Sequence, residues 1–276
     1  MFLKSLIIPQ NRLGDFIVCL WRFVKEHKRL PLHKGFNDTL FRIKVSREIL
    51  KSERQFISDK EFVKDYVKAR IGEKFNVPTK AILKTADEVK GYKFEFNDVV
   101  KPTHASGLVD IVKNPETINK EKYCEWLKIN YYSISREANY KWLTPKIIVE
   151  PLIFGKEDVN DVKFFCIKGK VKLIQVDFDR HTNHTRKLYK RNWADTKCSL
   201  CYPISKQKMK KPSRLKNMIF LAERLAEPFS FIRVDMYFDP KTNRVAIGEL
   251  TNCHGSAHEK FFSIDQEKKI NRIIFG

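Results

Sequence analysis

The chain has 276 residues, of which 42% are hydrophobic and 12% aromatic, and its 54 Lys and Arg against 33 Asp and Glu give a net charge of +21. This length and apolar content can fill the core of one large domain or two small ones, and they exclude a disordered chain. No apolar run is long enough to cross a bilayer, and the N-terminal segment lacks the features of a signal peptide. We therefore expect a cytoplasmic protein.

The excess positive charge predicts a polyanionic partner. Nucleic acid, an anionic polysaccharide, an anionic lipid and ATP all satisfy this expectation, and a basic surface that serves solubility alone is a further alternative. The chain has no recognised nucleic-acid-binding motif, so we expect no specific nucleic acid partner. Peripheral contact with the anionic inner face of a membrane remains among the expectations.

The six cysteines are expected to be reduced in a cytoplasmic chain. Cys198 and Cys201 form a single CxxC, whereas a zinc site needs about four ligands. His181 and His184 lie nearby in the sequence, so metal binding by this group is the less favoured alternative.

The first half of the chain begins with residues 10–75, which we predict to be helical. Within them, apolar side chains follow a helical spacing at Phe62, Val63, Tyr66, Val67 and Ile71. Ser58 or Asp59 is predicted to cap this helix and Gly72 to end it. Residues 79–148 mix short strands and helices, with a strand at 98–102 and helical residues at 119–139. After Pro145, the apolar run 147–154 is typical of a buried strand or a connector between two lobes.

The second half is rich in predicted strands. Residues 162–167 and 171–178 flank Lys168-Gly169-Lys170, a sequence that predicts a hairpin turn. Residues 213–227 form a predicted helix with Ser213 as its cap. Two more strands follow at 231–238 and 244–251, joined by a turn at 239–243.

The last two predicted strands carry a group of charges. Alternation places Phe231, Arg233, Asp235 and Tyr237 on one face of the first strand, and Val245, Ile247, Glu249 and Thr251 on one face of the second. Antiparallel pairing would bring Asp235 and Glu249 together, and two carboxylates repel unless a cation lies between them. Magnesium takes oxygen ligands and keeps phosphate oxygens in its shell, while Arg233 would bind phosphate. A solvated strand face with an ordinary Arg–Asp pair is the alternative.

Phosphate-binding glycine motifs are absent, since the sequence contains neither GxGxxG nor GxxxxGK[ST]. The nearest substitute is residues 101–107, where Lys101 precedes a small turn that ends in Ser106-Gly107. This turn could cover a triphosphate, and a plain surface turn is the alternative.

In order and spacing, these segments resemble the ATP-grasp enzymes, most closely the teichuronopeptide-biosynthesis (TupA-like) branch that is associated with polysaccharide gene clusters. The matching pieces are FND at 36–38, DK at 59–60, VKP at 100–102 with His104 and Ser106-Gly107, IVEPL at 148–152, DVKFFCIKGK at 161–170, DR at 179–180, FIRVDMY at 231–237 and GELT at 248–251.

The resemblance implies an α+β protein with the ATP-grasp fold, in which two α+β lobes clasp ATP after a short helical N-terminal region. It places the helical region at 1–75, the small lobe with its phosphate lid at 76–148, and the large lobe with the adenine connector and the metal site at 149–276.

The resemblance also implies roles for single residues. Lys60 and Lys101 would contact the ATP phosphates, with the turn 103–107 as a mobile lid. The other assignments are His104, Ser106 and Gly107 in the lid; Glu150, Pro151 and Leu152 at adenine; Glu157 or Asp158 at the ribose; Lys163, Arg180 and Arg233 at the reacting groups; and Asp235 and Glu249 on magnesium. Many family members have Asn two residues after the metal glutamate, where this chain has Thr251, so the third metal ligand stays open.

The implied reaction is ATP-dependent carboxylate–amine ligation through an acylphosphate. An amino acid or peptide would be attached to a uronic-acid carboxylate of a capsular or cell-wall polysaccharide, or of its lipid-linked or nucleotide-linked precursor. A kinase acting on a sugar or lipid hydroxyl with the same fold is one alternative, and a non-catalytic binder of polyanions or nucleic acid is another.

The segment 180–193 combines cations with aromatic residues and is a candidate for recognising an acidic sugar chain. Its predicted acceptor-binding residues are His181, His184, Arg186 and Arg191, because arginine binds carboxylates bidentately. A solvated basic loop is the alternative.

Overall fold

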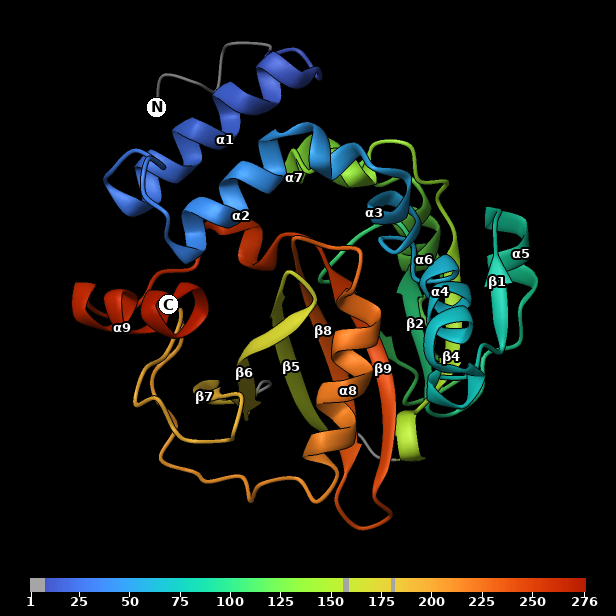
Figure 1. The fold of residues 1–276 in the computed structure, drawn as a ribbon. Coiled ribbons are helices and arrows are strands. Elements are labelled where there is room, and N and C mark those ends of the chain that lie inside the picture. Colours follow the sequence, from blue (N-terminus) through green and yellow to red (C-terminus); the bar gives the residue numbers. More distant parts are fainter. Residues whose placement is uncertain (1–7, 156–158, 180–181) are drawn as a thin grey trace.

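The computed structural model describes residues 8–155, 159–179 and 182–276, which form two antiparallel sheets and the helices around them (Figure 1). A four-stranded sheet has the order β1-β4-β2-β3, and a five-stranded sheet has the order β7-β6-β5-β8-β9. The strands are β1 Ala81–Leu83, β2 Asp98–Pro102, β3 Asp110–Ile111, β4 Ile147–Pro151, β5 Asn160–Ile167, β6 Lys170–Phe178, β7 Thr185–Lys190, β8 Phe231–Asp239 and β9 Arg244–Thr251.

The helices surround the two sheets on several sides (Figure 1). The α-helices are α1 Arg12–His27, α2 Phe36–Val45, α3 Ser52–Phe56, α4 Phe62–Ile71, α5 Ala86–Gly91, α6 Lys120–Leu127, α7 Tyr131–Ser135, α8 Leu215–Ala226 and α9 Ile264–Phe275. Short 3₁₀ turns are η1 Arg47–Leu50, η2 Glu73–Phe75, η3 Ala138–Tyr140, η4 Ile153–Gly155 and η5 His254–Ala257. Among the described residues, no helix combines the length and apolarity needed to cross a membrane.

The five-stranded sheet is apolar on the face that packs against α8. Val162 and Phe164 from β5 and Val234 and Met236 from β8 are fully buried there. Alternate residues of a strand point to one face, so these positions form a continuous apolar surface beneath the helix. The same core includes residues of α4, which joins the helical region firmly to this sheet.

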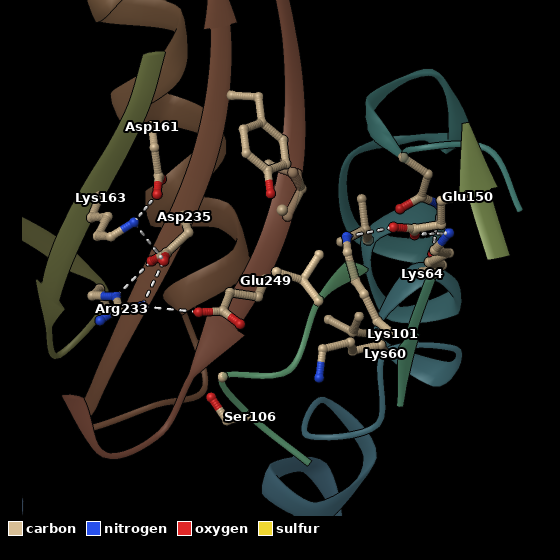
Figure 2. Close-up of a pocket in the computed structure, with 18 of the residues that line it drawn as sticks. Lys60, Lys64, Lys101, Ser106, Glu150, Asp161, Lys163, Arg233, Asp235 and Glu249 are labelled. Carbon is tan, nitrogen blue, oxygen red and sulfur yellow. Dashed lines mark hydrogen bonds and ion pairs between the residues drawn. The ribbon is translucent and has the colours of Figure 1, made fainter. Parts of the chain in front are cut away.

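The opposite face of the same sheet is divided between an apolar end and a charged end. At the apolar end, Phe165 and Phe231 are fully buried and pack edge-on against Phe36 of α2. Side chains of α1, α9 and η5 complete this second core. The charged end begins at Arg233, two residues after Phe231 on β8, and includes Asp235. It faces the four-stranded sheet (Figure 2).

The four-stranded sheet has its own small core with α5 and α6, which includes Val100 and Val149. Residues of β4 pair with β1 as far as Val149 and with β2 as far as Pro151. The predicted boundary between the lobes at residue 148 therefore falls inside a strand of this sheet. The chain crosses to the larger sheet only after β4.

Three local predictions are wrong in detail. Neither Ser58 nor Asp59 is the N-cap of α4, because the N-cap residue is Glu61, without a side-chain cap. Ser213 does not cap α8, because its hydroxyl lies 2.5 Å from Oδ1 of Asn243 and the N-cap residue is Arg214, without a side-chain cap. Residues 119–139 are not one helix, since Asn119 and Asn130 each cap a separate short one, α6 and α7. An asparagine side chain that accepts from a backbone N–H two or three residues on is favoured at a helix N-terminus, and the second such cap marks the start of a second helix.

The pairing of β8 with β9 places Asp235 opposite Glu249, as the sequence predicts. The predicted face of β9 is nevertheless wrong. Met236 pairs with Ile247, and the next pair is Asp235 with Glu249, so Gly248 is an extra residue between them. Such a β-bulge reverses the alternation of side chains beyond it.

The bulge separates the apolar and polar residues of β9. Val245 and Ile247 belong to the core beneath α8, whereas Glu249 and Thr251 contact Arg233 on the charged face. Without the extra residue, Glu249 would point into the apolar core. An ideal Cβ on Gly248 would lie 3.0 Å from Cε2 of Tyr237, so the bulge is tightly enclosed.

We predict that Gly248→Val lowers the free energy of unfolding by about 1–3 kcal/mol, because the added side chain overlaps the Tyr237 ring. Urea denaturation followed by circular dichroism measures this change. Gly91→Val is the matched control, since an ideal Cβ on Gly91 meets nothing within 4 Å. Equal stability of the two variants would show that the bulge tolerates a side chain.

Candidate active site

A cleft of about 360 Å³ lies between the two sheets and brings together nine of the residues that the sequence marks as functional (Figure 2). Its lining combines residues from the helical region, the four-stranded sheet and the five-stranded sheet. The predicted site residues that line it are Lys60, Lys101, Ser106, Gly107, Glu150, Lys163, Arg233, Asp235 and Glu249.

One wall of the cleft carries three lysines around a single carboxylate. The Glu150 carboxylate accepts from Nζ of Lys64 at 2.5 Å and from Nζ of Lys101 at 2.7 Å. Burial disfavours the charge of Lys101, but the adjacent Glu150 carboxylate outweighs it and raises the pKa of Lys101 above its usual value. Lys60 lies beside them and has no such partner, so burial lowers the pKa of Lys60 to about 8.

The turn that follows β2 lies next to these lysines. Nζ of Lys60 donates to the carbonyl oxygen of Pro102 at 3.0 Å and to that of Ala105, which ties the lysine to the turn. Gly107 adopts a φ of +81°, a conformation that favours glycine. His104 is buried instead of facing the cleft, and its Nδ1 accepts from the backbone N–H of Lys146 at 3.4 Å, so its predicted nucleotide contact lacks support.

The opposite wall is built on the charged face of β5, β8 and β9. Arg233 donates from Nε and Nη2 to both oxygens of Asp235, each at 2.6 Å. Lys163 lies 3.3 Å from Asp235 and also pairs with Asp161. The Arg233 guanidinium and Lys163 together hold the pKa of Asp235 below its usual value in spite of its burial.

Glu249 is the carboxylate of this wall that remains accessible. Its Oε1 accepts from Arg233 at 2.9 Å and from the Thr251 hydroxyl at 3.1 Å. The side chain is still 41% exposed, whereas that of Asp235 is 6% exposed. Glu249 can therefore bind an incoming cation without first leaving a buried site.

Behind the cleft wall, charged side chains close into a buried ring that we call the charge ring. From Asp235 and Arg233 it passes through His254, Glu259, Arg186 and Asp177 and returns to Lys163. The joining contacts are Arg233 with His254, His254 with Glu259 at 3.0 Å, Arg186 with Glu259 and with Asp177 at 2.6 Å each, and Lys163 with Asp177 at 3.8 Å.

The charge ring is balanced, which explains how it can be buried. Its lysine and two arginines match its three carboxylates, and Asp161 adds a further buried carboxylate beside Lys163. The contact with Arg233 indicates the neutral form, because a guanidinium can only donate and Nδ1 of His254 must therefore accept without a proton of its own. Burial and the nearby Arg233 also lower the pKa of His254, which favours the neutral ring. Buried charges are tolerated when each is paired in this way.

The carboxylates of the second wall fit a magnesium ion that arrives with a phosphate ligand. Magnesium is commonly held by one or two carboxylates, with phosphate oxygens and water completing its shell. Asp235 and Glu249 face each other across paired strands and offer such a set. Among the described residues, no group of three or more His, Cys, Asp or Glu side chains forms a ready metal cage. The remaining ligands would come from the substrate.

Several predicted site residues lie elsewhere. Pro151 and Leu152 are half-buried at the end of β4 and do not line the cleft, while Thr251 contacts the site through Arg233 and Glu249. Four further predictions, Glu157, Asp158, Arg180 and His181, lie outside the described residues.

Of the predicted acceptor-binding residues in the described part of the chain, His184 and Arg186 lie together against Asp177 and Tyr202, whereas Arg191 pairs with Glu223 instead. Arg186 lies on β7, not in a solvated loop, and its guanidinium is buried within the charge ring, so the structure gives no support to its predicted role as an acceptor ligand. Arg191 is exposed at the far end of β7, paired with Glu223 of α8 at 3.0 Å. His184 stacks on Tyr202 and lies 3.3 Å from Asp177.

Lys64, Asp161, Asp177, His254 and Glu259 belong to the site but were not predicted. Asp161 and Lys163 alternate on β5 as Arg233 and Asp235 do on β8, so strand periodicity could have found Asp161. His254 and Glu259 follow β9 in an irregular segment, where periodicity carries no information.

The two antiparallel sheets thus enclose a charged cleft from opposite sides. The profile of the TupA-like ATP-grasp family matches residues 41–274, and the chain belongs to this family. No curated protein matches the sequence significantly.

Solved structures of similar fold include two bacterial ligases. A D-alanine–D-alanine ligase from Bacillus anthracis, complexed with ATP, has 15% sequence identity and a TM-score of 0.40 over 72% of this chain. An L-amino acid ligase from Bacillus licheniformis has 12% identity and a TM-score of 0.48 over 90% of this chain. The match covers 55% and 56% of these two proteins, respectively.

We predict that Glu259→Gln lowers the free energy of unfolding at pH 7 by about 3–5 kcal/mol, because it leaves Arg186 without one of its buried partners. Glu227→Gln, at a surface pair with Arg70, should cost less than about 1 kcal/mol. Urea denaturation of both variants measures the difference. Equal costs would mean that the charge ring adds nothing beyond a surface ion pair.

The Glu259 carboxylate should also make the free energy of unfolding depend on pH. His254 and Arg186 lower the pKa of Glu259 from 4.5 to about 2, although burial opposes this. A depressed carboxylate stabilises the fold above its unfolded pKa, and the contribution is lost as pH falls from about 4.5 through about 2. As pH falls over that range, the free energy of unfolding should decrease less for Glu259→Gln than for the wild type.

Proposed function

We propose that this chain is an ATP-dependent carboxylate–amine ligase. The observation that supports it most is the cleft, in which lysines on one wall face Arg233, Asp235 and Glu249 on the other. Cations suited to a triphosphate and carboxylates suited to a divalent ion therefore line one space. Membership of the TupA-like ATP-grasp family supports the same assignment.

In the proposed complex, Lys60, Lys101 and the turn at 103–107 bind the phosphates of ATP. The half-buried lysines act as fixed positive charges at the wall of the cleft, where such charges are more effective than in bulk solvent. Magnesium, held by Asp235 and Glu249, would neutralise charge on the phosphate oxygens. Glu150, beside the lysines, keeps Lys64 and Lys101 in place through its two ion pairs.

Arg233 is proposed to stabilise the phosphoryl group as it transfers to a substrate carboxylate. Its guanidinium is held on one side by Asp235 and on another by neutral His254, so its planar donors are oriented before substrate binds. Preorganisation of this kind stabilises a transition state without a reorganisation cost. An amine then attacks the activated carboxylate and releases phosphate.

For the acceptor, we propose a uronic-acid carboxylate of a capsular or cell-wall polysaccharide or of its precursor, with an amino acid, peptide or other small amine as the second substrate. This choice is supported by the resemblance to the polysaccharide-associated branch and by the net charge of +21. Arg186 does not support this choice of acceptor, because its side chain is buried.

Hydroxylamine trapping tests the reaction class. A ligase supplied with ATP, magnesium and an acidic sugar oligomer should form a hydroxamate when hydroxylamine replaces the amine, with one phosphate released for each hydroxamate. A phosphorylated sugar or lipid made without any amine would identify a kinase. Salt-sensitive binding of nucleic acid without affinity for Mg·ATP would identify a non-catalytic binder.

We predict that Glu249→Gln reduces turnover by at least about a hundredfold, because the variant loses charge where the metal is proposed to bind. Its unfolding free energy should change by less than about 1 kcal/mol, since the side chain is 41% exposed. Steady-state kinetics and urea denaturation measure the two effects. Glu125→Gln, at an exposed pair with Lys128, is the control, and wild-type turnover in Glu249→Gln would refute the metal assignment.

We predict that ATP affinity falls as pH rises through the Lys60 pKa of about 8. The lysine is charged below that pH and neutral above it, so Kd should increase about tenfold between about pH 7 and pH 9. Calorimetric titration in buffers of different ionisation enthalpy should show proton uptake above pH 8. Lys60→Arg stays charged and should flatten the profile, whereas a flat wild-type profile would exclude Lys60 from phosphate binding.

A further inference from the structure

Helix α1 presents an apolar face to solvent. Leu13 is 69% exposed, Phe16 41%, Ile17 44% and Trp21 42%, and their spacing of three to four residues places them along one side of the helix. Val18, Cys19 and Phe23 on the other side are already buried in the core with α2. The exposed face is therefore not needed for folding, and water is an unfavourable environment for it.

Further apolar side chains are exposed next to this helix. Leu30 and Leu32, just after α1, are 51% and 80% exposed. Ile134 and Trp142 are also exposed, and their segment is joined to α1 and its start, since Arg22 donates to the Ile134 carbonyl at 2.9 Å and Lys141 to that of Gln10 at 3.0 Å. Exposed apolar groups gathered in this way mark an interaction surface.

The charges around this face are basic. Arg12, Lys25 and Lys28 are exposed along α1 and at its end. The acidic residues of α1 do not offset them, because Asp15 is buried against Tyr132 and Arg136 and Glu26 pairs with Lys260 at 2.9 Å. The occupant of this face must therefore be apolar at its centre and negative at its edge.

We propose that this side of α1, formed by Leu13, Phe16, Ile17 and Trp21 with Arg12, Lys25 and Lys28, is a membrane-docking surface for an anionic lipid bilayer. An amphipathic helix with a basic border binds such a bilayer by burying its apolar side chains at the level of the headgroups. The aromatic ring of Trp21, with Nζ of Lys25 5.2 Å from its centre, suits that interfacial depth.

A second copy of the chain fits this face less well. Two molecules joined through α1 would bring their basic borders together, whereas anionic headgroups would neutralise them. The helix also lies at the outer edge of the molecule, with α2 between it and the five-stranded sheet (Figure 1). Docking through α1 therefore leaves the cleft between the sheets open to substrate.

Flotation with lipid vesicles tests the surface without ATP or any substrate, so its outcome is independent of the proposed ligase activity. The wild-type chain should float with vesicles that contain phosphatidylglycerol and bind pure phosphatidylcholine at least about tenfold more weakly. The double variant Leu13→Glu/Ile17→Glu should lose at least about tenfold in partitioning to the anionic vesicles. The control Phe220→Glu/Ile264→Glu changes two exposed apolar residues on α8 and α9 and should bind like the wild type.

Trp21 reports the depth of docking. Brominated lipids quench tryptophan emission at the interface, so they should quench the wild type strongly and Trp21→Phe much less. The proposal fails if the wild type does not float, if the two double variants lose binding equally, or if Trp21→Phe is quenched as the wild type is. It fails equally if light scattering shows a dimer that Leu13→Glu/Ile17→Glu dissociates.

Discussion

The paired charges of Arg233 and Asp235 are the interaction on which the rest of the site depends. Both side chains are almost fully buried, and a buried charge is tolerated only when its partners compensate for lost hydration. The charge ring meets that requirement with matched numbers of cations and carboxylates around a neutral His254. It also joins β5, β6, β7 and β8 to the segment after β9, so one network stabilises the fold and orients the guanidinium at the cleft.

The two walls of the cleft differ in how their charges are paired. On the wall of the larger sheet, charges are closely paired and held rigidly, and Glu249 is the exposed carboxylate at the edge. On the other wall, Glu150 neutralises only part of the charge of the lysines near it, and Lys60 is bound to carbonyl oxygens of the turn. A polyanion can therefore be attracted by one wall while a cation it carries is bound by the other. This distribution of charge suits a nucleotide that binds together with its metal ion.

Helix α1, with its apolar face and basic border, lies at the outer edge of the molecule and is a second feature that concerns binding. A surface site for anionic lipid would hold the protein at a bilayer without any side chain of the cleft taking part. Part of the net charge of +21 lies in two places, the lysine wall of the cleft and the basic border of α1. Each acts locally, because charges separated by more than a Debye length of about 8 Å are largely screened.

The sequence by itself determined the hairpins, the apolar face beneath α8 and the pairing of Asp235 with Glu249, because each depends on alternation or on a short turn within a few residues. The tertiary structure alone decided which face of β9 carries Glu249, since one bulge residue, Gly248, reverses the alternation. It also decided that Arg186 is buried while Arg191 is exposed, although both stand in the same basic stretch. Such choices depend on partners far away in the chain, including Glu259 for Arg186, and no local pattern encodes them.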